Sequence, residues 1–173
     1  MSEGEPAQPT QPSASTEPPG PPRKQRISAR ALLRRTVDGF EEVLVARVSG
    51  SGYSSAGTWT LPGGGVDHGE HPEDSLRREV YEETGLTVEI RRILGVVSRH
   101  FTGPSPRGEI EDFHGVHLLY DAVVSSEADE PRVIEVGGTT DAVAWVRVDR
   151  LPAITVATVV REALALAETL ECP

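Results

Sequence analysis

The chain has 173 residues, and 17 Lys and Arg against 27 Asp and Glu give a formal net charge of −10. This balance argues against a protein that holds the nucleic-acid backbone, which needs clustered basic residues to displace counterions. The length suits one domain, and no run of apolar residues approaches the length of about 18 that a membrane helix requires. The single cysteine, Cys172, allows no internal disulfide. We therefore expect a cytoplasmic protein with neither a membrane nor an extended nucleic acid as partner.

Residues 1–26 are rich in Pro, Ser, Thr, Gln and Glu and nearly free of large apolar side chains. Such a segment cannot bury enough surface to offset its ordering entropy. We predict a disordered, proline-rich N-terminal tail over 1–26 and one folded domain over 27–173. A protein that recruits partners through this tail is an alternative, but the tail lacks a repeated Pro-x-x-Pro motif framed by basic residues.

The folded region opens with two β-rich runs, 28–37 and 42–48, which predict a hairpin. Asp38-Gly39 lies between them, and both residues tolerate the positive φ of a tight turn. A Gly- and Ser-rich loop over 49–57 then leads to a short strand at 59–61. Pro62 and three glycines close that strand.

The next segment, 72–84, predicts an α-helix. Proline stands at its first position, Gly85 follows as a left-handed terminator, and Leu76 and Val80 form one apolar stripe. The remaining elements are predicted strands at 87–97, 113–124 and 142–148 and a helix at 155–170. This order predicts an α/β fold, a mixed sheet with helices on its faces.

The negative charge is concentrated in residues 64–86, which contain seven carboxylates and two arginines. Their net charge of −5 is half of the net charge of the whole chain. On a helix, Glu79, Glu82 and Glu83 project within about 100° of arc. Uncompensated carboxylates so close together repel one another, whereas binding a hard divalent cation such as Mg²⁺ or Mn²⁺ makes their clustering favourable. The alternative is a solvated acidic helix face.

The spacing around these glutamates resembles a known family. Gly64, five residues, Glu70, seven residues and then Arg78-Glu79-Val80-Tyr81-Glu82-Glu83-Thr84-Gly85-Leu86 reproduce the complete Nudix box. The preceding Trp59 and Leu61-Pro62-Gly63-Gly64 resemble the usual lead-in. The resemblance implies an α/β/α sandwich around a mixed sheet and hydrolysis of a nucleoside diphosphate linked to a second group.

The resemblance also implies roles for single residues. Glu79, Glu82 and Glu83 would bind Mg²⁺, with Mn²⁺ as a substitute, and Gly64 would add its carbonyl oxygen. Glu70 would be a supporting carboxylate, and Arg78 would brace Glu82, which follows it by four residues. In one departure from the family pattern, His71 stands at the helix start, where Ser or Thr is usual and caps better.

The catalytic base is less defined, because relatives use either a box glutamate, here Glu82 or Glu83, or a carboxylate outside the box. We favour Glu135, in the loop that precedes Trp145, over Glu111 and Asp141.

Candidate substrate contacts are Arg47 and Arg99 for phosphate and Phe101 for stacking on a base. We expect a small nucleotide as substrate, either a nucleoside triphosphate or an ADP-ribose-like nucleotide. A non-catalytic nucleotide-sensing module is the alternative. Many relatives dimerise, and the sequence leaves a homodimer open.

Overall fold

The computed structural model describes residues 20–50, 55–105, 108–125 and 130–171. The strands are β1 (Arg23–Val37), β2 (Phe40–Val48), β3 (Trp59–Thr60), β4 (Gly63–Gly65), β5 (Val88–Pro104), β6 (Ile110–Val124) and β7 (Thr140–Arg147). The helices are α1 (Pro72–Thr84), the 3-10 helix η1 (Val148–Ala153) and α2 (Thr158–Glu171). No helix in these described ranges is long and apolar enough to cross a membrane.

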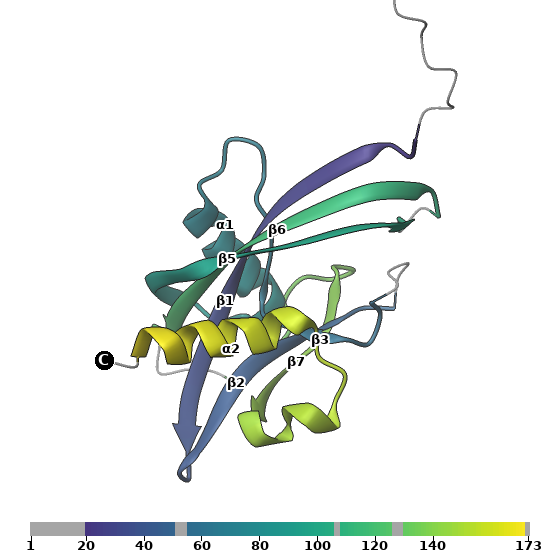
Figure 1. The fold of residues 1–173 in the computed structure, drawn as a ribbon. Coiled ribbons are helices and arrows are strands. Elements are labelled where there is room, and N and C mark those ends of the chain that lie inside the picture. Colours follow the sequence, from purple (N-terminus) through teal and green to yellow (C-terminus); the bar gives the residue numbers. More distant parts are fainter. Residues whose placement is uncertain (1–19, 51–54, 106–107, 126–129, 172–173) are drawn as a thin grey trace, which may run out of the picture.

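The strands form one seven-stranded mixed sheet in the order β3-β2-β1-β6-β5 (Figure 1). In addition, β4 pairs with β1 and β7 pairs with β2. β1 is the central strand, because residues 23–33 run parallel to β6 and residues 28–30 also pair antiparallel with β4, while residues 34–37 pair antiparallel with β2. The sheet thus brings β4 and β6 to opposite sides of residues 28–30. This junction positions the site described below.

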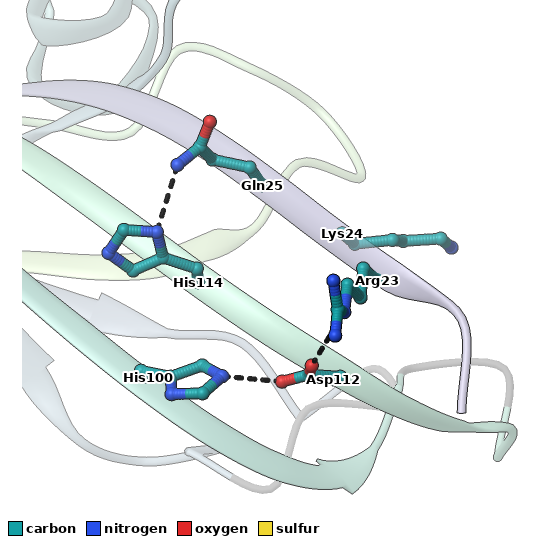
Figure 2. Close-up of a pocket in the computed structure, with 6 residues that line it drawn as sticks. All are labelled: Arg23, Lys24, Gln25, His100, Asp112 and His114. Atoms are coloured by element: carbon teal, nitrogen blue, oxygen red, sulfur yellow. Dashed lines mark hydrogen bonds and ion pairs between the residues drawn. The ribbon is translucent and has the colours of Figure 1, made fainter. Parts of the chain in front are cut away.

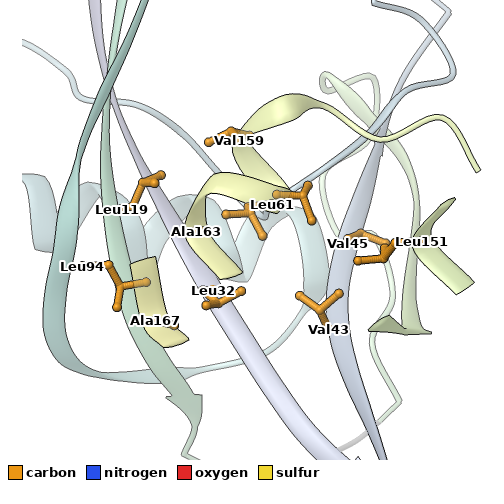
Figure 3. Close-up of a cluster of buried hydrophobic side chains, with 11 residues drawn as sticks. Leu32, Val43, Val45, Leu61, Leu94, Leu119, Leu151, Val159, Ala163 and Ala167 are labelled. Atoms are coloured by element: carbon orange, nitrogen blue, oxygen red, sulfur yellow. The ribbon is translucent and has the colours of Figure 1, made fainter. Parts of the chain in front are cut away.

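The two long helices cover opposite faces of the sheet, as the α/β/α prediction requires (Figure 1). Side chains alternate along β1, so Ala29, Ala31 and Leu33 pack with residues of α1. Leu32 points the other way into a second cluster, which α2 closes with Val159 and Ala163 (Figure 3). The sheet is therefore buried on both faces around its centre, and each helix is held by its own apolar core.

Local sequence signals for the first hairpin and for α1 are confirmed. Asp38 and Gly39 carry positive φ angles of 50° and 79° in the turn between β1 and β2. α1 spans the predicted residues, and Gly85 ends it in the left-handed conformation with φ 70°. His71 does act as its N-cap, because Nδ1 accepts a hydrogen bond from the Glu73 amide at 3.3 Å.

The start of the fold differs from the prediction. Residues 1–19 of the predicted tail lie outside the described residues, but Arg23–Arg26 are strand, the beginning of β1. They pair in parallel with residues 112–115 of β6. β1 thus begins before the predicted boundary at residue 26, because residues 23–26 pair through their backbone with a distant strand, which their polar composition does not reveal.

β5 and β6 are also longer than predicted, since they extend to Pro104 and back from Ile110. Together with the beginning of β1 they form a three-stranded projection beyond the two helices (Figure 1). We call residues 23–28, 98–104 and 110–116 the strand extension. Arg99 and Phe101 therefore lie within β5 rather than after it.

Candidate active site

A cavity of about 220 Å³ opens where β1, β4, α1 and β6 meet the residues just before β7. We call it the inner cavity. It brings together two carboxylates of α1, Glu79 and Glu83, with the glycine-rich turn and basic side chains of β1, whereas Glu82 does not line it. Its lining includes Arg26, Ser28, Arg30, Gly63, Gly64, Gly65, Glu79, Glu83, Phe113, Gly115, His117 and Thr140.

The glycines of β4 allow α1 to approach the sheet. A Cβ atom at position 64 would lie 2.2 Å from the carboxylate of Glu79, so this side chain rests directly on the Gly64 backbone. At Gly63, φ is 127° and a Cβ would lie 2.2 Å from the Ala29 carbonyl oxygen. The contact at Gly64 thus places a carboxylate of α1 against the β4 backbone, while the contact at Gly63 follows from the pairing of β4 with β1.

Glu83 is buried, with 5% of its surface exposed, and both of its carboxylate oxygens have protein donors. The Gly63 amide donates to Oε2 at 2.9 Å, and the Thr140 hydroxyl donates to Oε1 at 2.5 Å. Burial raises the pKa of Glu83, although these two hydrogen bonds oppose the rise. Glu83 thus joins α1 to β4 and β7 at the base of the inner cavity.

Arg78 links the box loop to α1. Its Nε and one terminal nitrogen donate to the two oxygens of Glu70 at 3.0 and 2.9 Å. The other terminal nitrogen donates to Glu79 at 2.9 Å and to Glu82 at 3.4 Å. The hydrogen bonds from Arg78 lower the pKa of Glu70 to about 2. The predicted brace on Glu82 therefore exists, but Glu70 is the stronger, bidentate partner.

The residues predicted to bind a metal fit a hard divalent cation in their donor chemistry. Glu79, Glu82 and Glu83 offer carboxylate oxygens, and the Glu79 carboxylate already lies against Gly64. Within the described part of the chain, however, no three Asp, Glu, His or Cys side chains gather closely enough to hold an ion. Arg78, Gly63 and Thr140 donate hydrogen bonds to these carboxylates, and a bound cation would compete with those donors.

Glu135 is one of the three carboxylates considered outside the box, and its backbone is bonded to the end of α1. Its amide donates a hydrogen bond to the Glu82 carbonyl at 3.0 Å. Its exposed side chain folds back over Gly138. Asp141 accepts a hydrogen bond from Arg47 at 2.7 Å, and the buried Glu111 forms an ion pair with the half-exposed Lys24 in the strand extension. Neither lines the inner cavity.

A second cavity, of about 450 Å³, lies along the strand extension, and we call it the outer cavity. It shares Arg26 and Phe113 with the inner cavity, so the two are contiguous. Phe101, predicted to stack on a base, lines it and packs on Phe113 with ring centroids 5.5 Å apart and planes tilted by 45°. Phe101 remains 53% exposed, which leaves a face for a planar ligand.

Arg26 is a cavity residue that the predicted boundary hid. It follows the alternation of Ser28 and Arg30 on one face of β1, so extending that strand by one more alternating position would have found it. Its guanidinium lies over Gly65, where a Cβ would be 2.4 Å away. Among the described residues it has no hydrogen bond or ion pair within bonding distance, so its donors are available to a ligand.

The two arginines predicted to bind phosphate are engaged elsewhere. Arg47 pairs with Asp141 and lies over the Trp59 ring, 5.7 Å from its centroid. Arg99 pairs with Glu162 of α2. Neither lines the inner or the outer cavity, whereas Arg26 and the half-buried Arg30 line the inner one.

A further hollow, of about 540 Å³, lies on the opposite face of the strand extension. Five of its six lining side chains pair with one another, as Figure 2 shows for Arg23 and His100 with Asp112 and for Gln25 with His114. None of the box carboxylates lines this hollow.

The arrangement of box, glycine turn and mixed sheet is that of a known family. The model of the NUDIX domain matches residues 24–167, so the chain belongs to the Nudix family. The MutT NUDIX hydrolase from Burkholderia pseudomallei superposes with a TM-score of 0.61 at 30% identity, covering 83% of this chain and 98% of that one.

Two further similarities differ in extent. An RNA pyrophosphohydrolase from Photobacterium profundum is 52% identical over 44 residues, which are 25% of each chain. The NUDIX domain of Shewanella oneidensis NrtR, solved in complex with ADP ribose, superposes with a TM-score of 0.63 at 22% identity over 86% of this chain and 89% of that one. The chain spans about a quarter of the length of the curated relatives it matches first, and the NrtR likeness shows the fold.

Proposed function

We propose that this protein hydrolyses a phosphoanhydride bond in a small nucleotide, either a nucleoside triphosphate or an ADP-ribose-like nucleoside diphosphate, with the help of a divalent metal. The observation that carries the proposal is the placement of Glu79 and Glu83 against the glycines of β4 in the inner cavity. Support comes from the contiguous outer cavity with its exposed Phe101, and from a relative named RNA pyrophosphohydrolase.

Glu79, Glu82, Glu83 and the carbonyl of Gly64 would hold the metal, which we propose to be Mg²⁺, with Mn²⁺ as a substitute. When bound, such an ion neutralises phosphate charge and makes water more acidic. Glu70 and Arg78 act through the carboxylates, because their bidentate pair fixes the guanidinium that contacts both Glu79 and Glu82. Without this pair the glutamates would lose a shared positional restraint.

The basic residues of β1 bind the substrate in this proposal. Arg26 stands in the wall shared by the inner and outer cavities, and its free donors suit a diphosphate that lies between them. Arg30 donates to the carbonyls of Leu61 and Gly63 at 2.8 and 2.9 Å, so it holds the glycine turn while adding positive charge. Phe101 stacks on the base.

For the proton of the attacking water we propose Glu135 as acceptor, with the box glutamates Glu82 and Glu83 as the alternative. The backbone of Glu135 is tied to the Glu82 carbonyl, which keeps its loop beside the end of α1. Its carboxylate folds over Gly138, and a rotation about its side-chain bonds releases it without moving that tie.

The test is a phosphate-release screen over nucleoside triphosphates, ADP-ribose, NADH, dinucleoside polyphosphates and capped RNA, with Mg²⁺ and with EDTA. We expect activity that EDTA abolishes and that falls at least about a hundredfold in Glu82→Gln, as the loss of a metal ligand should cause. Glu73→Gln is the matched control, since Glu73 lies on the same helix and pairs with Arg77. Near-full turnover in Glu82→Gln would remove Glu82 from the site.

The nucleotide-sensing module is the second candidate function. It predicts nucleotide binding without turnover of any compound in the screen, and that result would replace the hydrolase. The presence of all three box glutamates favours the hydrolase, since a sensor has no need for them.

A further inference from the structure

We propose that Lys24 and Glu111 form a specificity element that recognises the edge of the base in the outer cavity and selects guanine. The proposal rests on the proposed function in one respect, namely that a nucleotide places its base in this cavity. Lys24, Glu111, Phe101 and Phe113 all line it.

The strand pairing brings these side chains to one face of the strand extension. Lys24 lies opposite Phe113 in the parallel pairing of β1 with β6. Glu111 precedes Phe113 by two residues on β6 and therefore points to the same face. Phe101 lies opposite Phe113 on β5. The ion pair thus stands beside the two aromatic rings in the same cavity wall.

The burial of Glu111 calls for a functional explanation. Only 5% of its surface is exposed, whereas the Lys24 side chain is 53% exposed. Removing a carboxylate from water is costly even when it is paired, and an apolar pair would hold two strands together as well. Glu111 is also separate from the box carboxylates, since it does not line the inner cavity. A carboxylate held ready at an aromatic cavity is suited to a ligand with N–H donors.

The pair offers a specific order of hydrogen-bonding groups. The Lys24 ammonium is a donor, and the two oxygens of Glu111 are acceptors beside it. The Watson–Crick edge of guanine presents the complementary order, with the O6 acceptor followed by the N1–H and N2–H donors. Adenine presents one donor and one acceptor on that edge and lacks the third group. Cytosine and uracil each end in an acceptor that would face the carboxylate.

A pattern of three complementary groups predicts graded selectivity. Guanine makes all three contacts, and hypoxanthine, which lacks the 2-amino group, makes two of them. Adenine leaves part of the carboxylate without a donor, and unmet hydrogen-bonding groups in a binding site are what reject an incorrect ligand.

The experiment measures equilibrium binding of GMP, IMP and AMP to the full chain by calorimetry, without added metal. We expect GMP to bind at least about tenfold more tightly than AMP, with IMP between them, as a good edge contact provides. Glu111→Gln should reduce the GMP preference to less than about threefold, because its amide adds a donor where guanine needs an acceptor. Lys24→Met should weaken GMP binding while leaving the fold unaffected, since Lys24 is half exposed.

Arg23→Met is the matched control, because Arg23 lies next to Lys24 on the strand but pairs with Asp112 on the opposite face. It should retain the GMP preference. Equal binding of GMP and AMP by the wild-type chain, no measurable GMP binding, or an unchanged preference in both Glu111→Gln and Lys24→Met would each overturn the proposal. A thermal melt of every variant identifies any that fail to fold. If Glu111→Gln fails to fold, the GMP preference of Lys24→Met still tests the proposal.

The outcome separates this inference from the proposed function. A chain that prefers GMP but hydrolyses nothing in the screen retains the specificity element and loses the hydrolase. A chain that hydrolyses nucleotides with EDTA sensitivity but treats all bases alike retains the hydrolase and loses the specificity element.

Discussion

The neighbouring glycines Gly63 and Gly64 are needed for different reasons, and substitutions can separate them. Gly64→Ala would place a Cβ against the flexible end of Glu79, so we expect it to displace that carboxylate and lower kcat/KM at least about tenfold with little loss of stability. Gly63→Ala would meet the backbone of Ala29 at a φ of 127°, so we expect a loss of roughly 2 kcal/mol or more of unfolding free energy.

Activity assays and urea denaturation of the two variants, run side by side, check this pair of expectations. A Gly64→Ala protein with wild-type activity would show that Glu79 needs no contact with the backbone there. A Gly63→Ala protein of wild-type stability would mean that β4 can move away from β1.

His117 predicts a pH dependence of stability. It lines the inner cavity and shares a hydrogen bond of 2.6 Å with Ser28. Burial, followed by the positive charges of Arg30 and Arg99, lowers its pKa from 6.5 to about 4. The unfolded chain therefore takes up this proton first as the pH falls. The contribution of the neutral His117 side chain to the free energy of unfolding is complete above about pH 6.5 and is lost progressively toward about pH 4.

We expect the free energy of unfolding of the wild type to decrease as the pH is lowered from about 7.5 to about 5. For His117→Asn the decrease over the same interval should be smaller. Urea denaturation at several pH values measures both slopes, and NMR titration of the imidazole reports the pKa directly. An imidazole that titrates near pH 6.5 would contradict the lowered pKa of this half-buried side chain.

At the scale of elements, the loop that enters α1 depends on the Glu70–Arg78 pair. Arg78→Lys keeps the charge but loses the bidentate geometry, so we expect kcat/KM to fall about tenfold. Glu70→Gln should cause a similar loss, and the double variant should lose little more than either single one, because both act through one contact. Arg77→Lys, on the exposed side of α1, is the control and should remain within about twofold. Additive losses would show that the two residues act independently.

The elements with local signals were predictable from the sequence. α1 has a proline at its start, a glycine at its end and an apolar stripe, and its observed bounds are the predicted ones. The hairpin turn at Asp38-Gly39 was equally local. β4 was not predicted, because three glycines carry no strand signal and form one only through pairing with residues 28–30 of β1.

The candidate site shows the same division. The box spacing located Glu70, Arg78 and the α1 glutamates, since their arrangement follows from one loop and one helix. Phe113 became visible as a cavity residue only through the register of β1 with β6, a contact between distant segments, and the same pairing extends β1 back to Arg26. The pairing of Arg47 and Arg99 was not predictable either, because their acidic partners, Asp141 and Glu162, lie far away in the sequence.

At the scale of the whole molecule, the charge of −10 and the role of a metal are coupled. Half of the excess lies in residues 64–86, and the structure holds three glutamates of that segment on protein donors around Arg78, Gly63 and Thr140. A divalent cation that binds the folded state stabilises it by mass action, by about 2.7 kcal/mol at a concentration one hundred times its Kd. For a domain of this size that corresponds to a rise in Tm of roughly 5–10 °C.

We expect Mg²⁺ or Mn²⁺ to raise Tm by this amount and the double variant Glu79→Gln/Glu82→Gln to lose the response. Without metal the variant should stay close to wild type in stability, because relief of the burial cost at Glu79 and of like-charge repulsion offsets the weakened contacts with Arg78. Sodium chloride at matched ionic strength is the control for charge screening. Screening alone would raise the Tm of the wild type and of the double variant alike. If Mg²⁺ and matched sodium chloride shift the wild-type Tm equally, the glutamates of α1 are an acidic surface. The diphosphate would then have to be held by Arg26 and Arg30 alone, which would favour the sensor over the hydrolase.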